Sequence, residues 1–122
     1  MSKTILAIDD SASIRQMVGM TLMSAGHRVI EAVDGADGYG KATAEQVDAV
    51  ITDLNMPNLN GIEFIRKFRQ HPLSKGVPII LLTTESDEEL KRQAKEAGAT
   101  GWIVKPFKQD QLLAVIKKVT GA

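Results

Sequence analysis

The stretch AVITD, residues Ala49–Asp53, consists of four residues that suit a buried strand and then a carboxylate. It runs into LNMPNLNG over Leu54–Gly61, where a proline, three asparagines and a glycine disfavour any continuous helix or strand. In an open parallel sheet, active sites lie beyond the carboxyl ends of the strands. Asp53 is therefore either a residue that solvates a strand end or part of a functional site, and this stretch alone allows both interpretations.

Apolar runs alternate with helical patterns along the rest of the chain. We expect strands at residues 5–8, 28–32, 49–53, 78–82 and 101–105, and helices at about 14–25, 34–45, 62–68, 86–97 and 108–119. Parallel strands joined by right-handed helical crossovers form a sheet that is covered on both faces. The predicted fold is α/β, a flavodoxin-like (βα)5 three-layer sandwich whose five-stranded parallel sheet has the order 2-1-3-4-5.

The predicted helices differ in how well their sequences support them. Asn60 with Glu63, and Ser86 with Glu89, have the spacing of a capping box, which satisfies free N–H groups at a helix start. The segment 34–45 is weaker, because each of its three glycines costs about 1 kcal/mol relative to alanine. We assign a helix there because a crossover between parallel strands needs one.

Two predicted helices have apolar residues that bear on packing. Three methionines of the first helix are expected to fill the core, since methionine adapts to irregular gaps; they are Met17, Met20 and Met23. The helix over 86–97 has an unusually thin apolar stripe, made of Leu90, Ala94 and Ala97. We expect that helix to be attached to the sheet less firmly than the others.

The composition is that of an ordinary globular protein. The 122 residues suffice for one domain, residues 1–122, with a buried core. Fifteen basic and 15 acidic residues cancel, so no strong field exists to hold nucleic acid or an anionic membrane. The chain has no cysteine, which excludes disulfides and thiolate metal sites. It has no signal peptide and no apolar run near the roughly 20 residues that cross a bilayer, so we expect a soluble, cytoplasmic protein.

Charged and polar side chains gather where four of the predicted strands end. The carboxyl ends of strands one, three, four and five lie side by side in this fold, which brings together Asp9, Asp10, Asp53, Thr83, Thr84 and Lys105. Carboxylates repel one another by roughly 4 kcal/mol per pair at about 4 Å and an effective dielectric near 20, so a cation is expected among them. Oxygen ligands without His or Cys favour Mg²⁺. A carboxylate, a hard cation and an ammonium together predict phosphoryl chemistry through an acyl phosphate.

Four motifs at these strand ends resemble those of the receiver domains of two-component signalling, and closely those of CheY-like single-domain chemotaxis response regulators. They are Ile8-Asp9-Asp10-Ser11, Thr52-Asp53-Leu54-Asn55-Met56-Pro57, Leu82-Thr83-Thr84-Glu85 and Val104-Lys105-Pro106-Phe107. The resemblance extends over essentially the whole chain, and CheY is itself a standard example of the flavodoxin-like strand order.

The resemblance implies a role for each residue that faces the phosphoryl group. Asp53 would be the phosphoacceptor, Thr83 the switch hydroxyl and Lys105 the phosphate-binding lysine. The Lys105–Pro106 peptide bond would be cis, which aims the ammonium into the pocket.

The resemblance also implies a set of Mg²⁺ ligands. Asp10 would bind the ion directly, Asp9 through water and Asn55 through its backbone carbonyl, and Asp53 would also belong to the metal site. No other cofactor is implied.

Three further positions are expected to tune the switch. Trp102 stands where the family usually has Tyr or Phe that turns inward when Thr83 moves, and its larger ring is harder to bury. It is either this aromatic switch or a half-buried ring that covers a strand. Glu85 and Asn55 stand where the family tunes access of water to the acyl phosphate; a solvated carboxylate at a helix start is the plain alternative for Glu85.

The resulting interpretation is a phosphorylation-dependent binding switch rather than an enzyme. A histidine kinase of the CheA type would phosphorylate Asp53, and a monomeric receiver would then bind a flagellar motor switch protein or another phospho-dependent target. Because the chain ends with its fifth helix, we expect no output domain and place binding on the face of helix four, strand five and helix five. We expect neither nucleic-acid binding nor membrane insertion.

Three alternatives remain beside this interpretation. A receiver could be a phosphate sink that drains the kinase and binds no motor. A small Mg²⁺-dependent phosphatase is less well supported, because the Asp-x-Asp motif of haloacid-dehalogenase-type enzymes is absent after Asp9-Asp10. An FMN carrier is disfavoured because the acidic first loop, 10–13, would repel the FMN phosphate.

Overall fold

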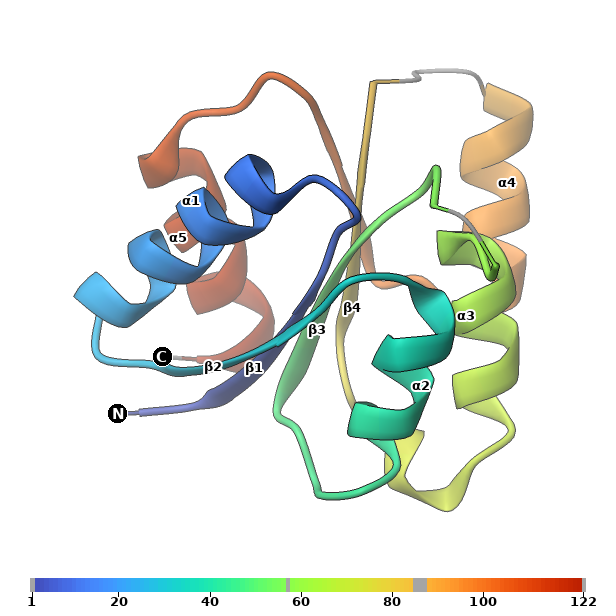
Figure 1. The fold of residues 1–122 in the computed structure, drawn as a ribbon. Helices are drawn as coiled ribbons and strands as arrows, with labels where there is room; N and C mark the ends of the chain where they lie inside the picture. Colours follow the sequence, from blue (N-terminus) through green and yellow to red (C-terminus); the bar gives the residue numbers. More distant parts are fainter. Residues whose placement is uncertain (1, 57, 85–87, 122) are drawn as a thin grey trace.

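A computed structural model describes residues 2–56, 58–84 and 88–121 and confirms the predicted fold (Figure 1). The strands are β1 (Thr4–Ile8), β2 (Arg28–Ala32), β3 (Ala49–Asp53), β4 (Ile79–Thr83) and β5 (Gly101–Val104). The helices are α1 (Ala12–Ser24), α2 (Gly35–Ala42), α3 (Gly61–Arg69), α4 (Glu88–Ala97) and α5 (Gln109–Thr120), with a short 3-10 turn at Pro72–Ser74. All strand pairs are parallel, in the order β2-β1-β3-β4-β5.

The helices form one layer on each face of the sheet, α1 and α5 on one side and α2, α3 and α4 on the other (Figure 1). Alternate residues of each strand point to opposite faces, so two cores form. In β1, Ile5 and Ala7 pack in the core under α1 and α5, while Leu6 and Ile8 pack in the core under the other three helices. Among the described residues, no helix is long and apolar enough to cross a membrane.

The sequence prediction for the methionines is wrong for two of them. Met20 is 67% exposed and Met23 is 53% exposed, and only Met17 is partly buried. The buried positions of α1 include Val18 and Leu22, one helical turn apart. Residues 20 and 23 fall away from that stripe because a helix has about 3.6 residues per turn.

Helix α2 is shorter than predicted, and one of its glycines is required by packing. It ends at Ala42 rather than at residue 45, with Thr43 as its C-cap. A β-carbon on Gly38 would lie 2.4 Å from Cδ1 of Ile8. The same residue that weakens the isolated helix therefore lets α2 approach β1 closely.

The capping predictions are confirmed where the structure describes the residues. Asn60 accepts the N–H of Glu63 at 2.9 Å, and Glu63 accepts the N–H of Asn60 at 3.0 Å, which is a complete capping box for α3. Ser86, the predicted cap of α4, lies outside the described residues. The thin stripe of α4 is also confirmed, because its only buried residues are Ala94 and Ala97.

Candidate functional site

The site lies at the carboxyl edge of the sheet, where β1, β3, β4 and β5 end side by side (Figure 1). Register explains why. Ile8 pairs with Thr52, so Asp9 and Asp53, the next residues along β1 and β3, come to the same level of the sheet. Thr83 pairs with Val104, so Lys105 emerges beside the end of β4, and its N–H donates to the Thr83 carbonyl at 2.7 Å.

Lys105 connects the two buried carboxylates. Its Nζ lies 2.9 Å from Oδ1 of Asp53 and 3.3 Å from Oδ2 of Asp9. Asp9 and Asp53 are 2% and 7% exposed, while Asp10 is exposed. The peptide bond between Lys105 and Pro106 is cis, as the resemblance implied. Three of the predicted strand-end residues therefore meet in one place, although sequence separations of 52 and 96 residues divide Lys105 from its partners.

The loops around the site are held by local contacts. Ser11 donates its N–H to Oδ1 of Asp9 at 2.9 Å and caps α1 through its side chain. The N–H of Gly61 donates to the carbonyl of Leu54 at 2.9 Å, which closes the irregular loop after β3. A β-carbon on Gly61 would lie 2.4 Å from the Asp53 carbonyl oxygen, so only glycine allows this closure without displacing the strand end.

Burial and the neighbouring charges together shift the pKa values of Asp53 and Lys105. Burial raises the pKa of Asp53, the nearby charge of Asp9 raises it further, and the hydrogen bond from Lys105 opposes the rise only in part. Burial favours the neutral form of Lys105, but Asp53 and Asp9 outweigh this effect and raise its pKa. Lys105 is thus a charged ammonium, and it does not fully compensate the carboxylates around it.

The acidic residues can form a metal site. Oxygen atoms of Asp9, Asp10 and Asp53 all lie within 4.8 Å of one another, a separation that a single cation can span. This donor set contains only carboxylate oxygen, the ligand type that Mg²⁺ prefers. The residues therefore fit the predicted ion. Asn55 is exposed in the loop beyond β3, and the role of its carbonyl stays a prediction.

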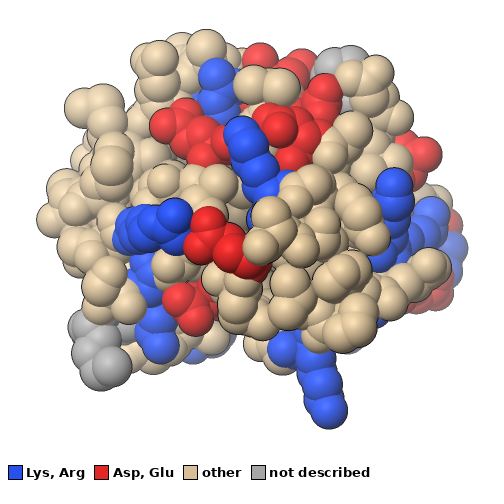
Figure 2. Space-filling model, turned by 60° about the horizontal axis from the view of Figure 1, so that its bottom comes forward, with Lys and Arg blue, Asp and Glu red and all other residues tan. Residues whose placement is uncertain are grey.

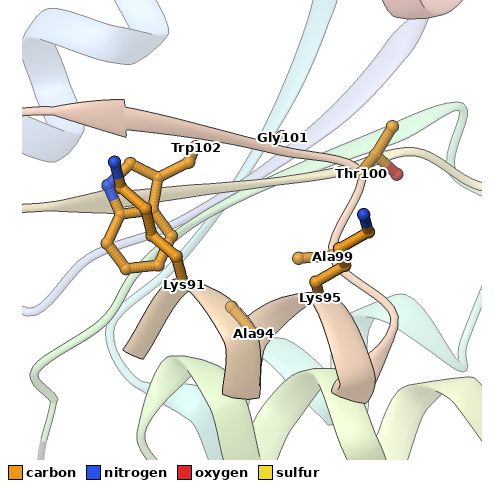
Figure 3. A pocket seen from close by; sticks show the side chains of 7 residues that line it. All are labelled: Lys91, Ala94, Lys95, Ala99, Thr100, Gly101 and Trp102. Carbon is orange, nitrogen blue, oxygen red and sulfur yellow. The ribbon is translucent and has the colours of Figure 1, made fainter. Parts of the chain in front are cut away.

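The predicted switch residues have different surroundings. Thr83 is 1% exposed at the end of β4. Trp102 lies on β5 against α4, beside Lys91, whose Nζ is 5.9 Å from a ring centroid (Figure 3). Within the described part of the chain, the buried indole N–H of Trp102 has no hydrogen-bond acceptor. Glu85 lies outside the described residues, so its predicted role has no structural counterpart here.

Sequence reasoning missed Arg15, which contacts the site from α1. Its Nη1 donates to the backbone carbonyl of Asp9 at 2.7 Å. A signal existed in its position, six residues after Asp9 and one turn into a helix that starts at the site. Helical arginines are usually solvated, however, and the sequence alone gave no reason to treat this one differently.

One face of the molecule carries both signs of charge (Figure 2). On the face shown in Figure 2, acidic side chains gather near the upper edge, while lysines and arginines are spread across it. This pattern agrees with a formal net charge of zero. A nucleic-acid-binding face usually needs clustered basic residues, and the face shown has no such cluster.

Comparison with known proteins identifies the family. The profile of the family described as "Response regulator receiver domain" matches residues 5–117. The phosphate regulon transcriptional regulatory protein PhoB of Pseudomonas aeruginosa is 36% identical over 117 residues; the match covers 96% of this chain but 51% of PhoB, so the chain spans about half the length of that relative.

Solved structures agree with this match. Chemotaxis protein CheY4 of Vibrio cholerae is 44% identical with a TM-score of 0.94, over 98% of this chain and 99% of CheY4. The receiver domain of sensor histidine kinase PA1611 of Pseudomonas aeruginosa, solved with a magnesium ion coordinated in its active site cleft, is 27% identical with a TM-score of 0.91, over the full length of both chains. The chain belongs to the receiver domains of two-component response regulators, with a CheY-like fold.

Proposed function

We propose that this receiver domain is a phosphorylation-dependent switch in which Asp53 accepts a phosphoryl group from a histidine kinase in the presence of Mg²⁺. The observation that supports this most is the contact of Lys105 with Asp53, inside a group of three carboxylates whose oxygens a single ion can bridge. A carboxylate held between an ammonium and a metal site is suited to attack phosphorus, because the charge on the phosphoryl oxygens is stabilised on both sides.

In the proposed reaction, a carboxylate oxygen of Asp53 attacks the phosphorus of a phosphohistidine. The P–N bond breaks as the O–P bond of the aspartyl phosphate forms, and the departing imidazole takes up a proton. Lys105 is already at 2.9 Å from Asp53, where its ammonium can also contact a transferred oxygen. When bound by Asp9, Asp10 and Asp53 and the Asn55 carbonyl, Mg²⁺ would neutralise charge on the phosphoryl oxygens.

The proposed switch runs from Thr83 to α4. Thr83 would donate its hydroxyl to a phosphoryl oxygen, and Trp102 and α4 would rearrange. Helix α4 buries only Ala94 and Ala97 among its residues, so little packing energy opposes its displacement. A difference of one or two hydrogen bonds can bias such an element between two positions. Glu85, with Asn55, would tune the access of water to the aspartyl phosphate.

We propose the face of α4, β5 and α5 as the output surface. A pocket of about 290 Å³ lies between α4 and β5, lined by Lys91, Ala94, Lys95, Ala99, Thr100, Gly101 and Trp102 (Figure 3). Trp102 and Lys91 lie together at one end of it. A shift of α4 would change this pocket directly, because α4 and β5 form its walls.

The proposed pathway is chemotaxis, with a kinase of the CheA type as donor and a flagellar motor switch protein as target. Similarity to CheY4 along nearly the whole of both chains supports it. The similarity to PhoB supports only the shared receiver, and a phosphate sink would use the same site. We further propose that residues 1–122 act as one cytoplasmic, monomeric receiver module without the turnover of an enzyme on free phosphomonoesters.

The phosphoacceptor is tested with a small phosphodonor. In Mg²⁺ and acetyl phosphate, the parent chain should gain one phosphoryl group by intact mass, and Asp53→Asn should gain none. Asp110→Asn, which changes an exposed carboxylate in the first turn of α5, is the matched control and should react like the parent. Uptake by Asp53→Asn at the parental rate would reject the assignment.

The target is tested by immobilising this receiver domain and measuring which motor and kinase components it retains. The measurement is made with and without beryllofluoride, which mimics the phosphoryl group on Asp53. A motor binder should retain the motor switch protein only with beryllofluoride. Rapid acceptance of phosphoryl groups from the kinase without retention of any motor component would indicate the phosphate sink instead.

A further inference from the structure

Arg15, on α1, joins Asp9 at the end of β1 to the edge strand β2. Its side chain is only 15% exposed, which is unusual for an arginine. Nη1 donates to the Asp9 carbonyl at 2.7 Å, and Nε donates to Oε1 of Glu31 on β2 at 3.1 Å. The Arg15 guanidinium on α1 thus binds both the backbone at the end of β1 and a side chain of β2.

The contact with the Asp9 carbonyl constrains the backbone position of Asp10. The peptide group between residues 9 and 10 is planar, so the direction of the Asp9 carbonyl determines where the N and Cα atoms of Asp10 lie. The Asp9 N–H donates to the Ala32 carbonyl at 3.1 Å, and its carboxylate accepts the N–H of Ser11. Arg15 supplies the remaining contact of this backbone unit, immediately before the exposed Asp10.

We propose that Arg15, oriented by Glu31, is a positioning residue that holds the Asp10 carboxylate within bridging distance of Asp9 and Asp53. Arg15 does not contact the metal, and its effect passes through the peptide group of residues 9 and 10. This inference rests on the proposed Mg²⁺ site. It extends that proposal by assigning control of metal affinity to a residue outside the acidic cluster.

Electrostatics and positioning predict opposite signs for the loss of Arg15. Removing a positive charge near three carboxylates should by itself tighten the binding of a divalent cation. Releasing the peptide group should weaken binding, because Asp10 then has to be ordered each time the ion binds. The sign of the change in Mg²⁺ affinity therefore distinguishes the two effects.

The chain offers a matched control in Arg28. It pairs with Glu45 by a comparable salt bridge at 2.8 Å, but both side chains are about half exposed. Arg28 pairs in the sheet with Thr4, at the end of β1 opposite to the site. Arg28→Gln changes the net charge as Arg15→Gln does, without touching the Asp9–Asp10 peptide group.

The experiment is a Mg²⁺ titration of each folded variant, followed by backbone amide chemical shifts, with melting temperature measured separately. Arg15→Gln should raise the Kd for Mg²⁺ about tenfold. This is the lower end of the usual loss of metal affinity when a group that orients a metal ligand is removed. Arg28→Gln should leave the Kd within a factor of two of the parent. An unchanged or lowered Kd for Arg15→Gln would overturn the proposal, even if that variant melts at a lower temperature.

Two further variants keep the result decisive. Arg15→Lys retains the charge but replaces the planar fork by one ammonium, which cannot hold Asp9 and Glu31 in the same way; it should also raise the Kd, and it decides the question if Arg15→Gln does not fold. Asp10→Asn tests the metal site itself. If Asp10→Asn binds Mg²⁺ like the parent, the proposed site is wrong, whereas loss in Asp10→Asn with no loss in Arg15→Gln rejects only the role of Arg15.

Discussion

Lys105 is the only cation that the structure places in direct contact with the central carboxylates, among its described residues. It balances part of the repulsion between Asp9 and Asp53 in the resting protein, and in the proposed reaction it would stabilise the transferred group. Both effects come from one ammonium on a side chain that is 15% exposed, where solvent screens its charge only partly.

Lys105→Met should therefore slow phosphorylation without preventing folding. Loss of one charged donor to a transition state typically costs about 10²–10³ in rate, so we expect uptake from acetyl phosphate to fall by about 10². Time courses of intact mass at fixed Mg²⁺ provide the measurement. Lys117→Met, on the exposed last turn of α5, is the control. A rate within threefold of the parent would contradict the role of Lys105.

Asp53 should also reduce the stability of the metal-free protein. Its pKa is raised by burial and by Asp9, whereas the unfolded chain has a value of about 3.9. The folded protein binds this proton more tightly, so the contribution of Asp53 to stability increases as pH falls through the raised pKa and levels off below the unfolded value.

Asp53→Asn should accordingly raise the melting temperature by a few degrees at pH 7 without Mg²⁺. This gain in melting temperature should be smaller at pH 4 than at pH 7. It should also be smaller at pH 7 when Mg²⁺ is added to both proteins. Melting curves by circular dichroism under these three conditions provide the measurement. A mutant that is less stable than the parent at pH 7 in chelator would show that the hydrogen bond from Lys105 outweighs the cost of burial.

At the scale of elements, α2 shows how a helix with poor propensity can be required by the fold. Gly38 and Gly40 lie in the same helix, and a β-carbon would meet Ile8 at Gly38 but has open space at Gly40. The two positions therefore separate helix propensity from packing.

Gly38→Ala should destabilise the protein and Gly40→Ala should stabilise it. Propensity favours alanine by about 1 kcal/mol at both positions. Overpacking typically costs about 1–3 kcal/mol, and at Gly38 the 2.4 Å approach to Ile8 places the cost at the upper end. Urea unfolding monitored by Trp102 fluorescence or circular dichroism measures both. Equal effects of the two substitutions would show that α2 can move away from β1 freely.

At the scale of the molecule, the parallel sheet connects the site to the proposed output surface. Thr83 and Trp102 belong to neighbouring strands, with Leu81 paired to Trp102 two residues before Thr83. Movement at the end of β4 can therefore reach β5 and α4 without passing through the core on the other face. Among the residues that the structure describes, the buried indole N–H of Trp102 has no acceptor.

Thr83→Ala should separate phosphorylation from the response. The variant should take up a phosphoryl group within about threefold of the parental rate, since Asp53 and Lys105 remain. The change in Trp102 fluorescence on addition of beryllofluoride should be lost, because no hydroxyl draws β4 toward the phosphoryl group. Trp102 is the only tryptophan of the chain, so its signal is unambiguous. A full fluorescence change in Thr83→Ala would exclude this route.

The sequence by itself determined the fold class, the strand order and the residues that meet at the carboxyl edge. Each predicted strand has an ordinary strand length, and strands one, three, four and five run into charged or polar residues, so the rules for parallel sheets leave few arrangements. Asp9, Asp53 and Lys105 could be grouped in this way because they stand directly at strand ends, whose level is set by the register of neighbouring strands.

Only the tertiary structure decided which side chains face the core and which contacts hold the site. Met20 and Met23 have apolar side chains like those of core residues, but the face of α1 that packs on the sheet does not include them, and they are exposed. Gly38 weakens a helix in isolation, but it is needed where α2 crosses Ile8. Arg15 reaches the Asp9 carbonyl only because α1 packs beside β2. Hydrophobic pattern and propensity are properties of single segments, whereas these contacts depend on how segments far apart in the chain pack together.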